Sequence, residues 1–142
     1  MTAHHKRMIK DYFAAGNVGK TDAQLALLDR DRFALQCHAA APLGYTKNYA
    51  ELEAMFGQMG SKMRSFVVDI DQMTAEEDRV AVKAHSTGVT ADGKPYCNEY
   101  HFLFWFADDR IVKIEEYLCS MTMAKVLNPE IWQAVDQPYN PA

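Results

Sequence analysis

Polar side chains interrupt the strongly apolar stretch "YCNEYHFLFWFADDRIVKIEEYLCS", which runs from residue 96 to residue 120. Asn98, Glu99, His101 and Cys119 stand there among aromatic and aliphatic residues. A carboxylate and an imidazole can move a proton together, because histidine titrates near neutral pH without much help from its surroundings. These residue types are therefore consistent with proton transfer on a small molecule, and equally with the polar rim of a sheet.

Glu99 and His101 are two residues apart, so on a strand they share a face and lie roughly 7 Å apart. They could act together on one substrate, or they could lie outside at a subunit interface. Asn98 and Tyr100 alternate with them and point to the opposite face. Only one of the two pairs can line an internal cavity, and alternation alone does not decide which.

Two more candidates lie earlier in the chain. His38 ends the alternating segment "RFALQCHAA", just before a loop that can form the rim of a pocket, where an imidazole would serve as a general base. Tyr12 lies on the apolar face of an N-terminal helix, where a phenol can donate a hydrogen bond to a carbonyl oxygen. The structural alternatives are a histidine satisfied by a backbone carbonyl and an aromatic core residue.

We expect neither a metal nor an organic cofactor. His85 could approach His101 across neighbouring strands, but no H-x-H or H-x-x-x-H pattern supports metal ligation. Cys37, Cys97 and Cys119 are odd in number and widely spaced, which favours buried reduced thiols over a disulfide framework or a zinc site.

Hydrophobic periodicity predicts the elements that must position these groups. Helices are expected over residues 3–15, 21–30 and 49–59, and Asn48 with Glu51 resembles a capping box for the third. The segment "RFALQCHAA" indicates a short strand, "APLGYTK" indicates a loop, and long strands are expected at residues 64–74, 79–90, 96–107 and 110–120. Three helices followed by a strand meander predict an α+β fold, with helices packed on one face of an antiparallel sheet.

The strand at residues 96–107 is apolar on both faces toward its end, unlike a sheet with one face in water. We therefore expect helices on one face and a second subunit on the other, which gives a homodimer through the sheet. A curved sheet closed by helices forms a cone, whose wide end is a natural small-molecule pocket. One domain is expected over residues 1–142, with about 129–142 as a candidate loose C-terminal tail.

Composition argues against several classes of protein. The chain has 142 residues, 49% of them hydrophobic and 24% charged, as in an average globular domain. Its formal net charge of -4, without a basic cluster, argues against nucleic acid or an anionic membrane as a partner. No apolar run approaches the roughly 20 residues of a membrane span, and the N-terminus lacks a signal-peptide core, so a cytoplasmic location is expected.

The order of elements, with the segments "HSTGVTADGKPYCNEY" and "EEYLCS", resembles the SnoaL-like branch of the nuclear-transport-factor-like superfamily. The first segment is similar to the "ST…T…G-x-P-Y-x-N-E-Y" run of small SnoaL-like proteins from fungal meroterpenoid pathways, which rearrange or cyclise ketonic intermediates. The resemblance implies an α+β barrel: a cone-shaped, curved antiparallel sheet wrapped around three N-terminal helices. The superfamily includes polyketide cyclases, ketosteroid isomerase, limonene epoxide hydrolase and scytalone dehydratase, so the fold does not set the reaction.

The resemblance carries over only some functional residues. Tyr12 falls where ketosteroid isomerase has a tyrosine that donates to the developing enolate oxygen. The general-base aspartate of that enzyme falls near "LQCHA", where this chain has Gln36 and His38 and no carboxylate. Its second oxyanion donor falls near His101 or Phe102.

The end of the last strand also departs from the family pattern. Cyclase-like members often end this strand with E-Y-x-D, whose aspartate can be the acid/base residue. This chain has "EEYLCS", so Cys119 replaces that aspartate. Glu116 could take over the role, although a solvated or salt-bridged glutamate is the commoner outcome.

Two hypotheses about function follow. The first is a cofactor-independent acid/base enzyme, an isomerase, cyclase or lyase acting on a hydrophobic, polycyclic or ketonic small molecule by isomerisation, cyclisation or hydration/dehydration. Its catalytic candidates are His38, Tyr12, His101 and Glu99, and its substrate-binding candidates are Tyr45, Phe56, Asn98, Tyr100, Trp105, Tyr117 and Cys119. The second is a non-catalytic module for hydrophobic-ligand binding or dimerisation, which the absent family carboxylates favour.

Overall fold

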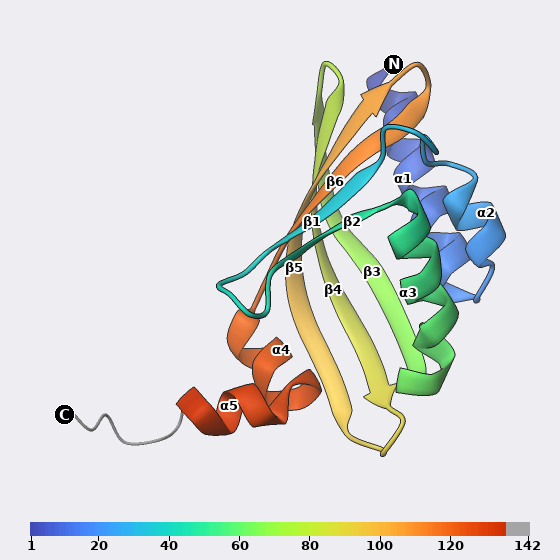
Figure 1. Ribbon diagram of the computed structural model, residues 1–142. Coiled ribbons are helices and arrows are strands. Elements are labelled where there is room, and N and C mark those ends of the chain that lie inside the picture. The colour runs from blue at the N-terminus through green and yellow to red at the C-terminus, as the bar shows by residue number, and fades with distance from the viewer. Residues whose placement is uncertain (136–142) are drawn as a thin grey trace.

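A curved sheet packs against three N-terminal helices in the computed structural model, which describes residues 1–135 (Figure 1). The helices are α1 Thr2–Asn17, α2 Thr21–Leu25, α3 Tyr49–Lys62, α4 Ser120–Leu127 and α5 Pro129–Val135. The strands are β1 Ala34–His38, β2 Tyr45–Asn48, β3 Met63–Glu76, β4 Arg79–Thr90, β5 Pro95–Ala107 and β6 Arg110–Leu118. In Figure 1, α1, α2 and α3 lie on one side of the sheet, and α4 and α5 lie at the end away from the N-terminus. The predicted α+β class is confirmed.

The sheet is mixed and open, whereas the sequence predicted an antiparallel sheet. Its strand order is β2-β1-β6-β5-β4-β3, so β2 and β3 are edges that do not pair with each other. Strands β3 to β6 form the predicted antiparallel meander, but β1 pairs with β6 in parallel. A parallel pair can form here because the chain that connects β1 to β6 is far longer than the dozen residues that such a connection needs. Strand β2 lies in the segment predicted to be a loop and pairs with β1.

Irregular pairing bends the long strands around the helices. Strands β3 and β4 shift register near Ser65 and again near Ile70, and β5 and β6 shift after Trp105. Such shifts bend a strand and increase its local twist. Gly88 permits the first bend, because a Cβ atom there would lie 2.7 Å from the backbone oxygen of Ser65.

Strand β5 alternates between buried and exposed residues, and its buried set faces the helices. The buried residues are Tyr96, Asn98, Tyr100, Phe102, Phe104 and Phe106. Phe104 is fully buried and meets the rings of Tyr12 and Phe13 of α1 edge-on. Glu99 and His101 are exposed on the opposite, convex face. The concave face therefore carries Asn98 and Tyr100, which answers the question that alternation left open.

Three other expectations concern the ends and the cysteines. No helix within residues 1–135 is long and apolar enough to cross a membrane. Helix α5 occupies the start of the predicted loose tail, and residues 136–142 of that tail lie outside the described residues. Cys37, Cys97 and Cys119 are free thiols as predicted, but only Cys37 is buried.

The predicted capping box at the start of α3 is present. Asn48 Oδ1 accepts a hydrogen bond from the Glu51 N–H at 2.9 Å, and Glu51 Oε1 accepts one from the Asn48 N–H at 3.0 Å. Because Asn48→Ala removes the side-chain acceptor of the first turn, we expect it to lower the free energy of unfolding by about 1 kcal/mol in urea titrations. Asn48→Asp keeps an acceptor and should lose much less. Equal losses in the two variants would contradict the capping role.

Candidate active site on the concave face

Glu116 of β6 is a carboxylate on the apolar, helix-facing side of the sheet. It pairs in register with Cys37 of β1 and with Phe102 of β5, both of which are buried on the concave face. Glu116 itself is only half-buried, so solvent reaches this part of the face. Within residues 1–135, no hydrogen bond or ion pair reaches its carboxylate. A charged carboxylate in such surroundings lacks the cation or hydrogen-bond donors that usually stabilise a buried carboxylate.

Burial raises the pKa of Glu116 to about 7. The cause is desolvation, because removing a carboxylate from water without supplying a cation or donors disfavours its charged form. At neutral pH both the acid and the base forms are therefore populated. A group in this state can accept a proton in one step of a reaction and return it in the next.

Protonated side chains from four elements lie within electrostatic range of this carboxylate. They are Tyr12 of α1, Cys37 of β1, Tyr45 of β2, and Tyr96 and Tyr100 of β5. Burial raises the pKa of each of these five groups, and the negative charge of Glu116 raises it further. They remain hydrogen-bond donors at neutral pH, as a developing negative charge on a substrate oxygen would require.

Two of these tyrosines belong to a buried hydrogen-bond network centred on Asn98. The Asn98 Nδ2–H donates to the Tyr96 hydroxyl at 2.9 Å, and the Asn98 backbone N–H donates to Ser86 Oγ at 3.2 Å. Ser86 Oγ and the Tyr100 hydroxyl are 3.0 Å apart and share a hydrogen bond. The other bonds of the Asn98 amide go to the backbone of Glu99 and Cys119, which fixes the chain at the start of α4.

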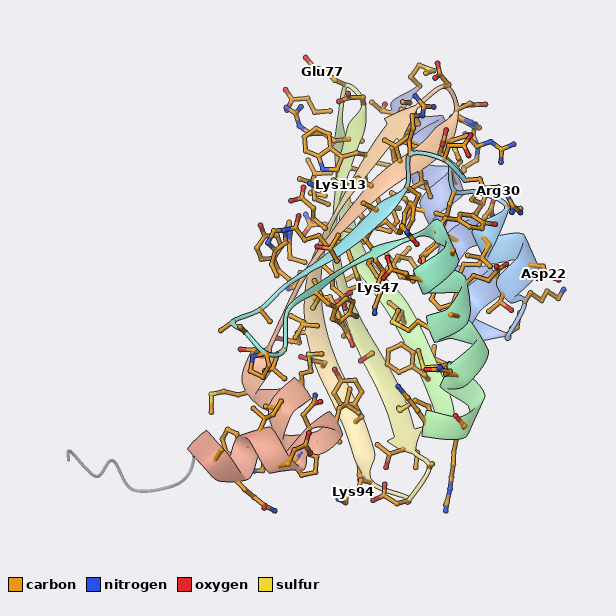
Figure 2. All side chains as sticks on the ribbon, in the orientation of Figure 1. Asp22, Arg30, Lys47, Glu77, Lys94 and Lys113 are labelled. Atoms are coloured by element: carbon orange, nitrogen blue, oxygen red, sulfur yellow. The ribbon has the colours of Figure 1, made fainter. Side chains whose placement is uncertain are left out.

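His38, the general base suggested by the sequence, lies on the convex face. Its Nε2 is 3.0 Å from Glu115 Oε1, and its ring stacks on Tyr117 with 4.3 Å between centroids. Trp105 Nε1–H donates to the other oxygen of Glu115 at 2.8 Å. Lys113, labelled in Figure 2, projects from the same side, away from α1, α2 and α3, with its Nζ 3.6 Å from Glu115 Oε1. His38 is thus one member of a paired polar cluster outside the cone.

The structure does not bring the four catalytic candidates together. Tyr12 is buried against the concave face, whereas His38, Glu99 and His101 lie on the convex one. The reason is strand alternation: the face of His38 is opposite to that of its buried neighbour Cys37. His85 is convex as well, and no group of three or more ligands that could hold a metal occurs within residues 1–135.

The substrate-binding candidates divide between the two faces in the same way. Tyr45, Asn98 and Tyr100 lie on the concave face, and Phe56 of α3 packs against the core. Trp105 and Tyr117 lie on the convex face, and Cys119 is exposed at the N-cap of α4.

The sequence suggested Glu116 only as a replacement for the family aspartate and not as one of the four catalytic candidates. The signal that could have singled it out is its place between Ile114 and Leu118, two aliphatic residues on the same face of the strand. A carboxylate on the apolar side of a strand is uncommon unless it is paired or functional. Glu115, with Lys113 and Tyr117 on its side, had the surroundings of an exposed glutamate.

A family model for the SnoaL-like domain matches residues 9–114. The chain belongs to the SnoaL-like domain family. This confirms the resemblance given by the sequence segments. In this SnoaL-like chain, Cys119 is exposed, and its Sγ accepts a hydrogen bond from Thr122 Oγ1 at 3.4 Å. That bond lowers the pKa of the Cys119 thiol.

Solved structures extend the likeness over nearly the whole SnoaL-like chain. PrhC from Penicillium brasilianum is 17% identical, with a TM-score of 0.77 and coverage of 96% of this chain and 93% of that one. BvnE pinacolase from Penicillium brevicompactum is 16% identical, with a TM-score of 0.74 and coverage of 92% and 98%. A putative polyketide cyclase from Xanthomonas campestris is 22% identical, with a TM-score of 0.67 and coverage of 82% and 90%. Such likenesses show a shared fold, and no curated protein matches the chain.

The raised pKa of Glu116 predicts a loss of stability as the pH rises. The folded state holds the proton up to about pH 7, whereas the unfolded chain releases it near the ordinary value of 4.5. Stability from the neutral carboxyl is therefore complete below about pH 4.5 and declines up to about pH 7, by about 3 kcal/mol at most. Urea unfolding across this range should show the decline in the unsubstituted protein and not in Glu116→Gln. Parallel curves for the two proteins would contradict the assignment.

Proposed function

We propose that the chain is a cofactor-independent acid/base enzyme in which Glu116 transfers the proton. The observation that carries the proposal is the half-buried carboxylate of Glu116, which has no counter-charge among residues 1–135 and lies on the same face as buried tyrosines. A glutamate with only a structural role would be more stable in water or beside a cation. Glu115 of the same strand is placed in this way, next to His38 and Lys113.

The chemistry begins with a ketone whose acidic C–H lies next to its carbonyl group. The Glu116 carboxylate takes the proton from carbon, the C–H bond breaks, and its electron pair moves onto the carbonyl oxygen as an enolate. A tyrosine hydroxyl on the concave face donates a hydrogen bond to that oxygen. The protonated Glu116 then returns its proton to another carbon, giving an isomer. Alternatively, the enolate carbon attacks a second carbonyl carbon, whose C=O π bond breaks, and the oxygen formed there takes the proton from Glu116, giving a ring.

The surroundings of Glu116 favour a hydrophobic substrate. Side chains of Tyr45, Met55, Phe56 and Phe66 are packed against the core and remain partly exposed. Apolar and aromatic surfaces of this kind bind flat or polycyclic molecules through burial of area, with few polar contacts to set the orientation. The names of two structural neighbours, a pinacolase and a putative polyketide cyclase, support a small-molecule enzyme of this general type.

Measurement of turnover distinguishes Glu116 from His38, the general base that the sequence suggested. Exchange of α-hydrogens for deuterium in a panel of polycyclic ketones reports enolisation without knowledge of the natural product. We expect Glu116→Gln to slow exchange by about 100- to 10,000-fold, and the rate for the unsubstituted protein to rise with pH through about 7 as the carboxylate forms.

His38→Ala is the matched control, because it removes a titratable side chain that lies on the convex face, opposite to the face of Glu116. It should leave exchange within a few-fold of the unsubstituted rate. Loss of exchange in His38→Ala with Glu116→Gln unaffected would overturn the proposal. Binding of the ketones without exchange in any protein would favour the non-catalytic binding module instead.

We also propose that the protein forms a homodimer through the convex face of the sheet. Tyr117 is 48% exposed there, beside half-buried Trp105 and Leu103 and the paired cluster of His38 and Glu115. An extended face that mixes aromatic, aliphatic and internally paired polar residues is suited to a second copy of itself.

Light scattering at tens of micromolar checks this assembly. We expect a dimer for the unsubstituted protein and a monomer for Tyr117→Glu, because two new charges would face each other across a two-fold interface. Val18→Glu, at an exposed position beyond the end of α1, should remain dimeric. A monomer in all three samples would remove the proposed interface.

A further inference from the structure

Three hydroxyl groups form a buried chain on the concave face. Ser86, Tyr100 and Tyr96 are 2%, 6% and 3% exposed, respectively. Ser86 Oγ bonds the Tyr100 hydroxyl at 3.0 Å, and Asn98 links this pair to the Tyr96 hydroxyl. Asn98 donates to both ends of the chain, through its backbone N–H to Ser86 and through Nδ2–H to Tyr96.

A count of protons shows that these hydroxyls have at least one donor left over. Three hydroxyl groups carry three protons, and the Ser86–Tyr100 bond uses one of them, whichever way it points. Asn98 occupies an acceptor position on both end oxygens and offers them no acceptor in return. Within residues 1–135 no further acceptor bonds to these hydroxyls. One O–H is therefore available to an oxygen that arrives from outside the chain.

We infer that the Ser86–Tyr100–Tyr96 chain is a donor site for a negatively charged oxygen, and that the ligands of this face are enols and phenols bound in their ionised form. The inference rests on the proposed function, because it assigns the substrate oxygen of that reaction to particular donors. Phe66 stacks beside Tyr96 with 6.2 Å between ring centroids and is itself partly exposed, which suits a flat aromatic or enolised ring.

Glu116 makes the charge balance of this binding possible. When a neutral phenol gives its proton to the Glu116 carboxylate, the O–H bond breaks, the electron pair stays on the phenol oxygen, and a neutral carboxylic acid forms. The face then carries one negative charge before and after the transfer, and no proton enters or leaves the solvent. The new phenolate oxygen accepts the spare hydroxyl proton of the chain.

Asn98 acts in this site as a positioning residue. Its two Nδ2 protons go to Tyr96 and to the backbone oxygen of Cys119, and its Oδ1 accepts from the backbone N–H groups of Glu99 and Cys119. The amide is thus fully used within the protein, so it orients the hydroxyl chain and does not itself bind the ligand. This differs from the substrate-binding role expected from the sequence.

Titration with 4-nitrophenol and phenols of graded acidity tests the inference, since absorbance separates the ionised from the neutral form. We expect the unsubstituted protein to bind these phenols and to increase the ionised fraction on binding. Tyr96→Phe should weaken binding by about 10-fold or more and abolish the increase, because it removes one charge-assisted hydrogen bond. Ser86→Ala should act in the same direction, and Ser86→Thr, which keeps the hydroxyl, should restore binding.

Controls separate the donor site from a loss of folding and from the role of Glu116. Tyr117→Phe removes a hydroxyl on the convex face and should bind phenols like the unsubstituted protein, and thermal unfolding should show every variant folded. Unchanged phenol binding in a folded Tyr96→Phe, or no phenol binding by the unsubstituted protein, would overturn the donor site. If Glu116→Gln keeps ketone exchange while Tyr96→Phe loses phenolate binding, the proposed base fails and the donor site stands.

Discussion

The carboxylate of Glu116, held beside apolar side chains, is the constraint on which this molecule's concave face depends. A lone carboxylate in such a place loses several kcal/mol of hydration if it stays charged, and proteins relieve that cost by pairing or protonation. This chain supplies no pairing within residues 1–135, so the carboxyl holds its proton up to about pH 7. The tyrosines around it keep their protons for the same reason, since burial and the nearby charge both disfavour ionisation. The concave face therefore holds a set of protonated weak acids, among which Glu116 has a pKa near neutrality.

The topology of the sheet is what encloses this carboxylate. Strand β1 joins β6 in parallel, and β2 joins β1, so two short strands extend the sheet beyond β6. That extension places Cys37 directly beside Glu116 and brings Tyr45 onto the same face. Helix α1 covers the same concave face with Tyr12, whose ring packs on Phe104. An antiparallel meander of β3 to β6 alone would leave Glu116 on an edge strand, open to water.

Local patterns in the sequence were enough for most of the elements. Amphipathic spacing predicted α1 and α3, and alternation predicted β3 to β6, because each of these is long enough for its period to be read. The parallel pairing of β1 could not be predicted, because it depends on contacts between residues almost 80 positions apart. Strand alternation could not show which face was concave either. Phe and Tyr on one face of β5 are about as apolar as Leu and Trp on the other. His38 was a candidate because of its residue type. The face on which it lies depends on the pairing of β1 with β6, which the sequence does not reveal.

Two adjacent glutamates show how completely the face of a strand decides chemistry. Glu115 and Glu116 have the same side chain and neighbouring backbone positions, yet alternation sends them to opposite sides of the sheet. On the convex side, Trp105 and His38 bond Glu115 and Lys113 lies near it, and these partners outweigh its partial burial and lower its pKa. On the concave side, Glu116 has no such partner within residues 1–135, and burial alone raises its pKa. A shift of register by one residue would exchange these environments, placing the paired cluster inside the cone and the reactive carboxyl outside. The register shift after Trp105 and the parallel pair with β1 fix that register. They thereby keep Glu116 on the concave face and Glu115 on the convex face.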